Sequence, residues 1–480
     1  FDLSSESGNS SAGSAGQSFF DNAKGKVNAK AHHRVRIEGS REEEETGALS
    51  HLVPMTSFLP THLLKHLVKK EERRSITKGE VFYESEELKE EVCVLFIDIS
   101  GFTHLTEQLA VHKNGAENLS KIVNRFFKKL INKIIEYGGD IERMAGDALI
   151  STFWTKSEGI TLTEATNRAL LCAYEITQDI KLRKYKVSNK NTLTLHIGLA
   201  AGPCNIYHIG GVEDTFWRLC FSDALHELAT AIAESDDGEI VITGNTYPIV
   251  ESYIKARSIV NSENYLFESY LDTPPRKPTI TPLEITTVHE DWMRYFIDTH
   301  SLEAIDTNQA SSEFMSGIKQ ASIVFVTIQC DSNVMAKSGL SMWDDLMENV
   351  QKSVYSYEGV IGNFLNDEKG VLLFCAFGHP KMHVNDPYRA IRCAIEIGEH
   401  LKTNPYFKFG IGVTTGKVFL GTCGSHDRRD FSFLGDSVNL AARLMKISFT
   451  DHEGSIIADN TTHAKSKVEI AYTQLDPVTV

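Results

Sequence analysis

The feature that most constrains this chain is an internal duplication. VCVLFIDI at 92–99 has a counterpart in SIVFVTI at 322–328, and LHIGLAAGPCNI at 195–206 has one in FGIGVTTGKVFL at 409–420. The matching segments keep the same order and lie roughly 215–230 residues apart. Repeat arrays have much shorter periods, of about 20–50 residues. The sequence therefore predicts two copies of one domain rather than a solenoid.

The order of elements within each copy indicates the fold class. Each copy reads as a strand, a helix, a two-stranded hairpin, a helix and a strand, followed later by a further helix and strand. Helices interleaved with strands that include a tight hairpin are typical of an α+β sheet with helices packed on one face. Two such halves in one chain are expected to pack as an intrachain pseudo-dimer, with functional sites at the shared interface.

Composition along the chain sets the expected boundaries. Residues 1–50, rich in Ser, Gly and charge, are predicted to form a disordered tail, because they bury too little apolar surface to offset the entropy of ordering. Residues 51–88 carry apolar side chains at helical spacing and are predicted to dock as an amphipathic helix. The two copies are expected at 89–261 and 319–480, joined by a proline-containing linker at 262–318.

Charge and cysteine usage exclude several classes of protein. The net charge of −15 is unlike the basic excess that neutralises nucleic-acid phosphates, so no nucleic-acid partner is expected. No apolar run is long enough to cross a bilayer, and no signal-peptide core opens the chain. The eight cysteines form no CxxC pairs and stand mostly in apolar runs, which favours buried thiols in a cytoplasmic compartment. The chain begins with Phe1, which allows further domains or partner proteins beyond this fragment.

Two carboxylates of the first copy stand where a metal site could form. Asp98 ends the run VCVLFI just before a predicted helix, and Asp147 lies in the turn of MAGDALI between two short strands. Strand ends and hairpin turns meet at one rim of a sheet, where carboxylates can hold Mg²⁺ or Mn²⁺ and leave room for phosphate oxygens. The amides from Ile99 to Thr103, at a helix start, could cradle a polyphosphate. Alone, each aspartate is more simply a helix cap or a turn residue.

The second copy supplies a different pair of polar residues. Asn439 and Arg443 are four residues apart, hence on one face of a predicted helix. An amide could position a ribose oxygen, and a guanidinium could stabilise charge on an α-phosphate, although such a pair alone is usually a solvated face. The first copy reads DALHELATAI where the second reads DSVNLAARLM, and the second copy lacks the matched aspartates. Each half keeps what the other lacks, which favours one composite site.

Several motifs together resemble those of the class III nucleotidyl cyclases, and specifically the soluble, bicarbonate-responsive adenylyl cyclases. These are FIDISGFTHLTEQL, GGDIERMAGDAL, HIGLAAG and LGDSVNLAARLM, and the similarity extends in matching order over about residues 55–475. The resemblance implies two ferredoxin-like α+β cyclase domains packed as an intrachain pseudo-heterodimer. It also implies one active site that converts ATP to cyclic AMP and pyrophosphate.

The resemblance further implies roles for individual residues. Asp98, Asp147 and the backbone carbonyl of Ile99 would hold two divalent metal ions, Mg²⁺ or Mn²⁺. Asn439 would orient the ribose and Arg443 would stabilise the transition state, so that positioning and charge lower the barrier. The implied substrate-binding residues are Ser100, Gly101, Phe102, Thr103, His196, Asn363, Ser432 and Phe433.

Four positions depart from the pattern of that family. Asn363 and Ser432 occupy the adenine-reading positions, the first of which is often lysine, and both can donate and accept hydrogen bonds. His196 replaces a basic residue that normally helps to bind the phosphates. In the degenerate twin site, where bicarbonate binds in the soluble enzymes, Arg143 fits one of two cations. Glu227 stands at the other, which disfavours an anion.

Two alternatives stay open at this point. One is a guanylyl or mixed-specificity cyclase, although guanylyl cyclases usually place glutamate where this chain has Asn363. The other is a catalytically weak pseudo-cyclase that acts as a regulatory or scaffold module. Retention of both aspartates together with Asn439 and Arg443 disfavours the second alternative, because a scaffold has no chemical need for all four.

Overall fold

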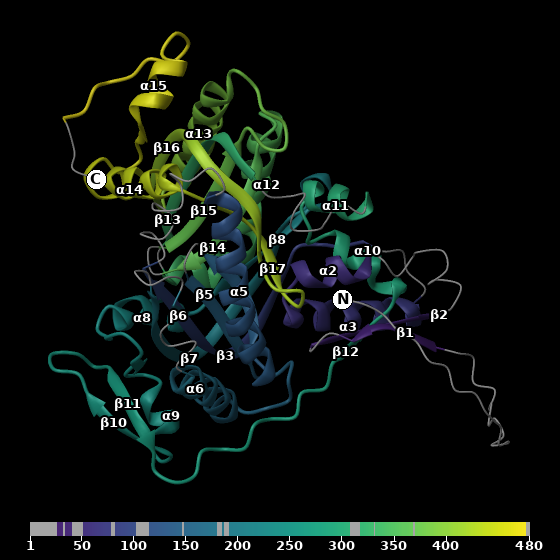
Figure 1. The fold of residues 1–480 in the computed structure, drawn as a ribbon. Coiled ribbons are helices and arrows are strands. Elements are labelled where there is room, and N and C mark those ends of the chain that lie inside the picture. The colour runs from purple at the N-terminus through teal and green to yellow at the C-terminus, as the bar shows by residue number, and fades with distance from the viewer. Residues whose placement is uncertain are drawn as a thin grey trace, which may run out of the picture.

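The computed structural model describes most of the chain and divides it into two similar halves and a smaller third unit (Figure 1). The described residues are 26–31, 34–40, 51–77, 82–101, 115–145, 148–179, 185–186, 192–307, 317–330, 332–367 and 370–476. The first half contains β3 (Glu86–Ser100), α5 (Gly115–Glu136), β4 (Asp140–Ala145), β5 (Ala148–Trp154), α6 (Leu162–Gln178), β6 (Tyr185–Lys186), β7 (Thr192–Gly210), η2 (Val212–Asp214), β8 (Phe216–Phe221), α8 (Asp223–Ile232), β9 (Ile240–Ile242), α9 (Tyr247–Val250), β10 (Ile254–Ser258) and β11 (Tyr265–Tyr270). The second half contains β13 (Gly317–Cys330), α12 (Ser332–Ser356), β14 (Val360–Asp367), β15 (Gly370–Phe377), α13 (Asp386–Thr403), β16 (Phe407–Gly424), β17 (Arg429–Leu434), α14 (Asp436–Asp451), β18 (Ile456–Ala458) and α15 (Asn460–Ser466). The third unit contains β1 (Lys26–Ala31), β2 (Val35–Ser40), α2 (Leu52–Phe58), α3 (Thr61–Thr77), β12 (Leu283–Ile285), η3 (Thr287–His289), α10 (Glu290–Arg294) and α11 (Thr299–Asp306).

The two large sheets share one topology. The first has the order β10-β11-β9-β7-β3-β5-β4, with β6 and β8 also paired to β7. The second has the order β14-β15-β13-β16-β17, with β18 paired to β16. In both sheets the first long strand of the half lies between the hairpin and the second long strand, and a short strand pairs parallel to the second long strand. The predicted α+β duplication is therefore confirmed.

The halves interlock at the ends of their long strands. The Oδ1 atom of Asn124 in α5 accepts a hydrogen bond from the backbone N–H of Gly424, the last residue of β16, at 2.9 Å. In the equivalent helix α12, Oδ1 of Asp344 accepts from the N–H of Gly210, the last residue of β7, also at 2.9 Å. Each strand end is thus held by a polar side chain of the opposite half, which is the geometry of a pseudo-heterodimer within one chain.

The two hydrophobic cores also cross this boundary. The core of the first half includes Phe419, Cys423 and Leu434 from the second half. The core of the second half includes Tyr207, Ile209 and Leu219 from the first. Burying these side chains removes apolar surface of both halves from water at once, so neither core is complete without the other half.

The third unit corrects the prediction of a disordered tail. The disordered tail predicted over 1–50 includes β1 and β2, and β2 pairs in parallel with β12 from the predicted linker 262–318. Val35 and Ile37 alternate towards a core that also holds Trp292 and Met293 of α10. The tail prediction was wrong here because Val35 and Ile37 are buried against segments that lie nearly 250 residues later in the chain. Residues 1–25, 32–33 and 41–50 lie outside the described residues.

The sheet of the first half also continues past the predicted boundary at residue 261. The hairpin of β10 and β11 extends it to Tyr270, and Figure 1 shows this hairpin at one end of the first half. All eight cysteines are free thiols, and only Cys330 of them is partly exposed. Among the helices that the structure describes, none combines the length and apolar character needed to cross a membrane.

Candidate functional site

A cavity of about 690 Å³ lies between the two halves, with the third unit contributing to its wall. Aromatic and aliphatic side chains make up most of the lining, which is typical of a small-molecule site. The polar residues that line it are Asp98, Glu142, Arg143, Thr215, Arg218, Asp298, His300, Asn363, His379, Arg428, Asp430, Ser432, Asn439, Arg443 and Lys446. The cavity therefore joins the two polar groups that the sequence analysis had located in different halves.

Asp98 comes to the cavity because of its place near the end of β3. It lies opposite Ala148 of β5 and His196 of β7, at the rim of the first sheet. Burial raises the pKa of the Asp98 carboxyl above its ordinary value, while His196 and a backbone N–H act in the opposite direction. Asp98 forms no salt bridge with any other residue in the described ranges. A half-buried carboxylate in this situation gains stability from a bound cation.

Asn439 and Arg443 lie on helix α14, which packs directly on β16. Gly412 makes this close approach possible, since a Cβ atom there would lie 2.1 Å from the carbonyl oxygen of Ala441. The Oγ1 atom of Thr414 also donates to the carbonyl of Ser437 at 2.7 Å, which fixes the start of the helix. The glycine-rich FGIG pattern of β16 thus determines how deeply α14 sits, and with it where Asn439 and Arg443 point.

Asn363, Ser432 and Phe433 line another part of the same cavity. A β-bulge between Ile361 and Asn363 interrupts the pairing of β14 with β15. The Oδ1 atom of Asn363 is buried and has no hydrogen-bond partner among the described residues. The ring of Phe433 packs against Phe374, with centroids 4.9 Å apart. An aromatic surface beside an unpaired amide is a suitable place for a planar, hydrogen-bonding ring.

Other predicted site residues lie away from the cavity or outside the description. Ile99, Ser100 and Gly101 follow Asp98 along the chain but are not among the residues lining the cavity. Phe102, Thr103 and Asp147 lie outside the described residues.

His196 has polar partners of its own within the first half. Its Nε2 lies 3.2 Å from Oδ1 of Asp237, and its Nδ1 lies 3.0 Å from the carbonyl oxygen of Ser235. These partners come from the segment after α8, and His196 is not among the residues that line the cavity. The expected contact of His196 with substrate phosphates stays a prediction; in the structure the imidazole acts on Asp98, whose pKa it lowers.

Arg143 lines the cavity, whereas its predicted partner position Glu227 does not. The Arg143 guanidinium lies 5.8 Å from the ring centroid of Trp217, and burial lowers its pKa. Glu227 instead accepts a hydrogen bond from the side chain of Asn245. Of the two positions predicted for the anion site, the cavity lining thus includes only Arg143.

A buried polar network, not predicted from the sequence, borders the cavity at Arg218. Its Nε lies 2.7 Å from Oε1 of Glu142, its Nη1 lies 3.3 Å from Nε2 of His208, and its Nη2 lies 3.1 Å from Nδ1 of His62. Each histidine extends the network to a carboxylate of β3: His62 to Glu90 and His208 to Glu86. The side chains come from segments up to 156 residues apart, so no local motif announces them.

One part of this network has the composition of a metal site. The ligand atoms of His66, Glu86 and His208 all lie within 4.8 Å of one another. Arginine is only a donor, so Arg218 requires a lone pair on Nε2 of His208 and leaves the proton on Nδ1. Since Nδ1 is the atom that faces Glu86 at 3.1 Å, a metal ion would have to displace that proton. The cluster is accounted for as a hydrogen-bond network.

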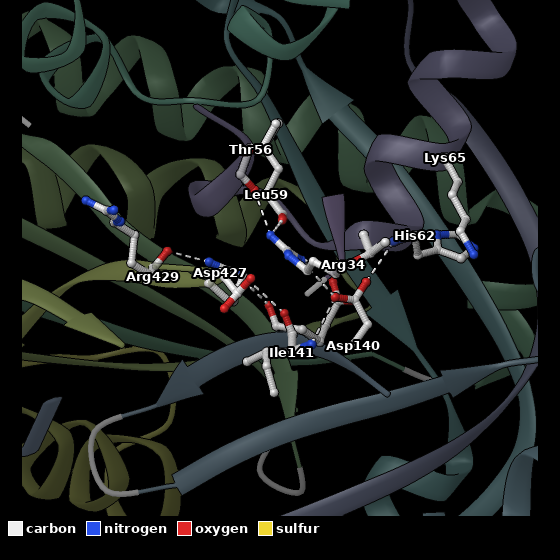
Figure 2. Close-up of polar contacts among 12 residues, drawn as sticks. Arg34, Thr56, Leu59, His62, Lys65, Asp140, Ile141, Asp427 and Arg429 are labelled. Carbon is white, nitrogen blue, oxygen red and sulfur yellow. Dashed lines mark hydrogen bonds and ion pairs between the residues drawn. The ribbon is translucent and has the colours of Figure 1, made fainter. Parts of the chain in front are cut away.

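Arg34 links the third unit to the first half beside the cavity (Figure 2). Its guanidinium donates to the carbonyl oxygens of Thr56 and Leu59, each at 2.7 Å, and lies 3.3 Å from Oδ1 of Asp140. The other carboxylate oxygen of Asp140 accepts from the backbone N–H of His62 at 2.7 Å. Burial lowers the pKa of Arg34 to about 10, although Asp140 opposes this change. Arg34 thus connects the start of the chain to the turn between α2 and α3, which forms part of the cavity wall.

Comparison with known proteins agrees with this architecture. Residues 84–267 match the family model of the adenylate and guanylate cyclase catalytic domain. The fold resembles a class III adenylyl cyclase-like ATP-binding protein from Pseudomonas aeruginosa, with a TM-score of 0.53, 11% identity, and coverage of 83% of this chain and 92% of that one. The first half thus contains a segment that matches the class III cyclase catalytic domain, and the fold is class III cyclase-like over most of the chain.

Within that class the chain is similar to adenylate cyclase type 10 of Homo sapiens. The two are 24% identical over 405 residues, which cover 78% of this chain and 24% of the human protein. Adenylate cyclase 1 of Rhizobium meliloti is 27% identical over 145 residues, covering 28% of this chain and 21% of that protein. The chain spans about a quarter of the length of the curated relatives that it matches over 405 residues.

Proposed function

We propose that this chain converts ATP to cyclic AMP and pyrophosphate at the cavity between its halves. The observation that carries the proposal is that Asp98 of the first half lines the same cavity as Asn439 and Arg443 of the second. Similarity to adenylate cyclase type 10 supports ATP as the substrate. The proposal includes a cytoplasmic location, which the eight free cysteines support.

The residues at the rim of β3 suit divalent metal ions. Asp98 offers oxygen ligands, is not in a salt bridge within the described ranges, and has a pKa raised by burial, so a bound cation would favour its ionised form. The proposed set is completed by Asp147 and the carbonyl of Ile99. Two Mg²⁺ or Mn²⁺ ions bound there would lower the pKa of the ribose 3′-hydroxyl and neutralise the leaving pyrophosphate.

The side chains of α14 would act on the substrate directly. The Asn439 amide would hold the ribose so that its 3′-oxygen lies in line with the α-phosphorus. The Arg443 guanidinium would donate to the α-phosphate oxygens as their charge increases in the transition state. The 3′-hydroxyl would lose its proton to water, and its oxygen would bond to the α-phosphorus while the bond to the pyrophosphate oxygen breaks. Because α14 is held against β16, these groups need little reorganisation during the reaction.

Base recognition would fall to Asn363 and Ser432. The buried Oδ1 of Asn363, which has no partner among the described residues, could accept a hydrogen bond from the amino group of adenine, while the amide NH₂ donates to a ring nitrogen. An amide can rotate to read guanine as well, so mixed specificity is the alternative that the site itself permits. Asn363→Lys would place a donor-only group there and is expected to shift selectivity further towards ATP.

The decisive experiment compares cyclic AMP and cyclic GMP formation by the purified chain with ATP or GTP in Mn²⁺. We expect cyclic AMP as the main product, and Asp98→Asn should reduce its formation on the order of 100-fold or more, since it removes a charged ligand. Asp272→Asn, in an exposed loop away from the cavity, is the control. If cyclic GMP were the main product, the substrate would be GTP and not ATP. Nucleotide binding without turnover of either nucleotide would instead favour a regulatory pseudo-cyclase.

A further inference from the structure

Helix α14 presents a third polar side chain to the cavity, beyond the two that the sequence analysis singled out. Lys446 follows Asn439 by seven residues and Arg443 by three, a spacing that places all three on one face of an α-helix. All three line the cavity. Lys446 is exposed, and none of the salt bridges among the described residues includes it. Its ammonium is therefore free to meet a ligand.

The direction of α14 indicates which part of a nucleotide Lys446 would meet. Ser432 and Phe433, the proposed base end, lie on β17 immediately before the helix. Asn439 for the ribose and Arg443 for the α-phosphate follow in that order along the helix. With a rise of about 1.5 Å per residue, Lys446 lies about 10 Å beyond Asn439 along the axis. The proposed contacts therefore run in order from the base to the ribose and the α-phosphate. The next position along the helix, Lys446, would meet the β- and γ-phosphates.

The site still lacks a cationic side chain for the β- and γ-phosphates, and Lys446 can supply it. A triphosphate needs cationic partners beyond its α-phosphate. His196, expected at the phosphates, is engaged by Asp237 and Ser235 outside the cavity lining. Arg218 is paired with Glu142, and Arg428 is paired with Asp430 at 2.6 Å. Arg143 also lines the cavity, where its guanidinium lies 5.8 Å from the ring centroid of Trp217.

On these grounds we infer that Lys446 binds the β- and γ-phosphates of the substrate and the pyrophosphate that is released. This inference rests on the proposed function for the placement of the nucleotide. It assigns to α14 a phosphate subsite outside the cyclase motifs quoted above, since the motif LGDSVNLAARLM ends at Met445, the residue before Lys446.

The test is calorimetric binding of inorganic pyrophosphate with Mn²⁺ to the whole chain. Lys446→Met keeps the apolar stem and removes the charge, and we expect about tenfold weaker pyrophosphate binding, as for the loss of one charge-assisted hydrogen bond. Lys446→Arg should restore the affinity. Lys402→Met, on the exposed last turn of α13 and outside the cavity lining, is the matched control and should bind like the unaltered chain. Adenosine, which lacks phosphates, should bind all four proteins equally.

The kinetic consequence is a higher KM for ATP and weaker product inhibition by pyrophosphate in Lys446→Met. Equal pyrophosphate affinity of Lys446→Met and the unaltered chain would overturn the inference, and so would an equal loss in Lys402→Met, which would reveal only a change of overall charge. The two proposals fail in different ways. Absence of cyclic nucleotide from the unaltered chain rejects the proposed function, even where pyrophosphate binding depends on Lys446. Normal cyclisation with unchanged pyrophosphate affinity in Lys446→Met rejects the phosphate subsite alone.

Discussion

Arg218 donates from Nη1 to Nε2 of His208 across 3.3 Å, and this single contact fixes the tautomer of a buried imidazole. Because Nε2 must accept, the proton lies on Nδ1, which faces the hydroxyl oxygen of Tyr83 at 2.6 Å and Oε1 of Glu86 at 3.1 Å. The same logic applies to His62, whose Nδ1 accepts from Arg218 and whose Nε2 then donates to Glu90 at 2.9 Å. One guanidinium is thus connected through two neutral histidines to two carboxylates of β3.

The stability of the fold should fall in mild acid because of His208. Burial is the largest cause that lowers its pKa, to about 3, and Arg218 adds to it while Glu86 opposes it. The unfolded chain takes up a proton below the ordinary pKa of about 6.5, which the folded chain does not. The contribution is therefore complete above pH 6.5 and is lost as the pH falls towards 3. From pH 7 to 5 we expect a loss of about 2 kcal/mol from this residue.

Urea unfolding at several pH values measures this effect. His208→Asn keeps a donor towards Glu86 but does not titrate, so its stability should fall less than that of the unaltered chain between pH 7 and 5. Parallel pH profiles for the two proteins would contradict the assignment, whatever their absolute stabilities.

Removing the carboxylate beside Arg218 should be costly. Glu142 and Arg218 are 8% and 6% exposed, and Glu142 is the anion that contacts the guanidinium directly. Glu142→Gln would leave a buried cation with neutral partners and should lower the free energy of unfolding by about 3–5 kcal/mol. Glu348→Gln, which breaks the exposed pair with Lys352 on α12, should change it by about 0.5 kcal/mol or less. Equal effects in chemical denaturation would show that the Glu142 pair is screened by solvent.

Activity should depend on a glycine that never touches substrate. A Cβ at Gly412 would lie 2.1 Å from the carbonyl of Ala441 and 2.5 Å from the N–H of Met445, so Gly412→Ala must push α14 outwards. Displacing Asn439 and Arg443 by about 1 Å is expected to reduce kcat on the order of 100-fold. Gly317→Ala, whose added Cβ meets nothing within 4 Å, is the control. Unchanged kcat in Gly412→Ala would mean that the position of α14 is not critical.

Loss of Arg34 should loosen the third unit selectively. Arg34→Met removes the donors to the carbonyls of Thr56 and Leu59 and leaves the buried carboxylate of Asp140 without its cation. We expect faster amide hydrogen exchange in α2 and α3, with the strands of the second half unchanged. Arg276→Met, in an exposed loop, should leave exchange unchanged. Uniformly faster exchange in Arg34→Met would indicate global destabilisation and not a local fastening.

The predictable parts of the structure were those that depend on short sequence patterns. The apolar runs ending at Asp98 and Ile328 predicted equivalent central strands, and the duplication predicted their equivalent neighbours. The meeting of Asp98 with Asn439 and Arg443 followed from a strand end, a helix face and the assumption that the halves pack together. Lys446 has the same spacing signal, seven residues from Asn439, but a lone lysine on a helix is usually a solvated residue, so spacing alone does not predict a site there.

The features that could not be predicted depend on partners distant in sequence. His196 turns towards Asp237 because of the segment that follows α8, and nothing near residue 196 announces that contact. The strand β2 exists because β12, from the proline-containing segment, pairs with it in parallel. Likewise, the Arg218 network is assembled from α3, β3, β4, β7 and β8, each of which contributes one or two polar residues that look like ordinary surface positions.

The exchange of strand ends between the halves, with Asn124 holding Gly424 and Asp344 holding Gly210, has a consequence for stoichiometry. Two copies of the first half meeting through this surface would gather acidic groups twice over with no guanidinium from α14, and two copies of the second half would do the reverse. Covalent tethering makes the unlike partner always the nearest one, at a high effective concentration. The chain thereby avoids pairs of like halves, which would lack a complete site. Separate subunits would have to select against such pairs.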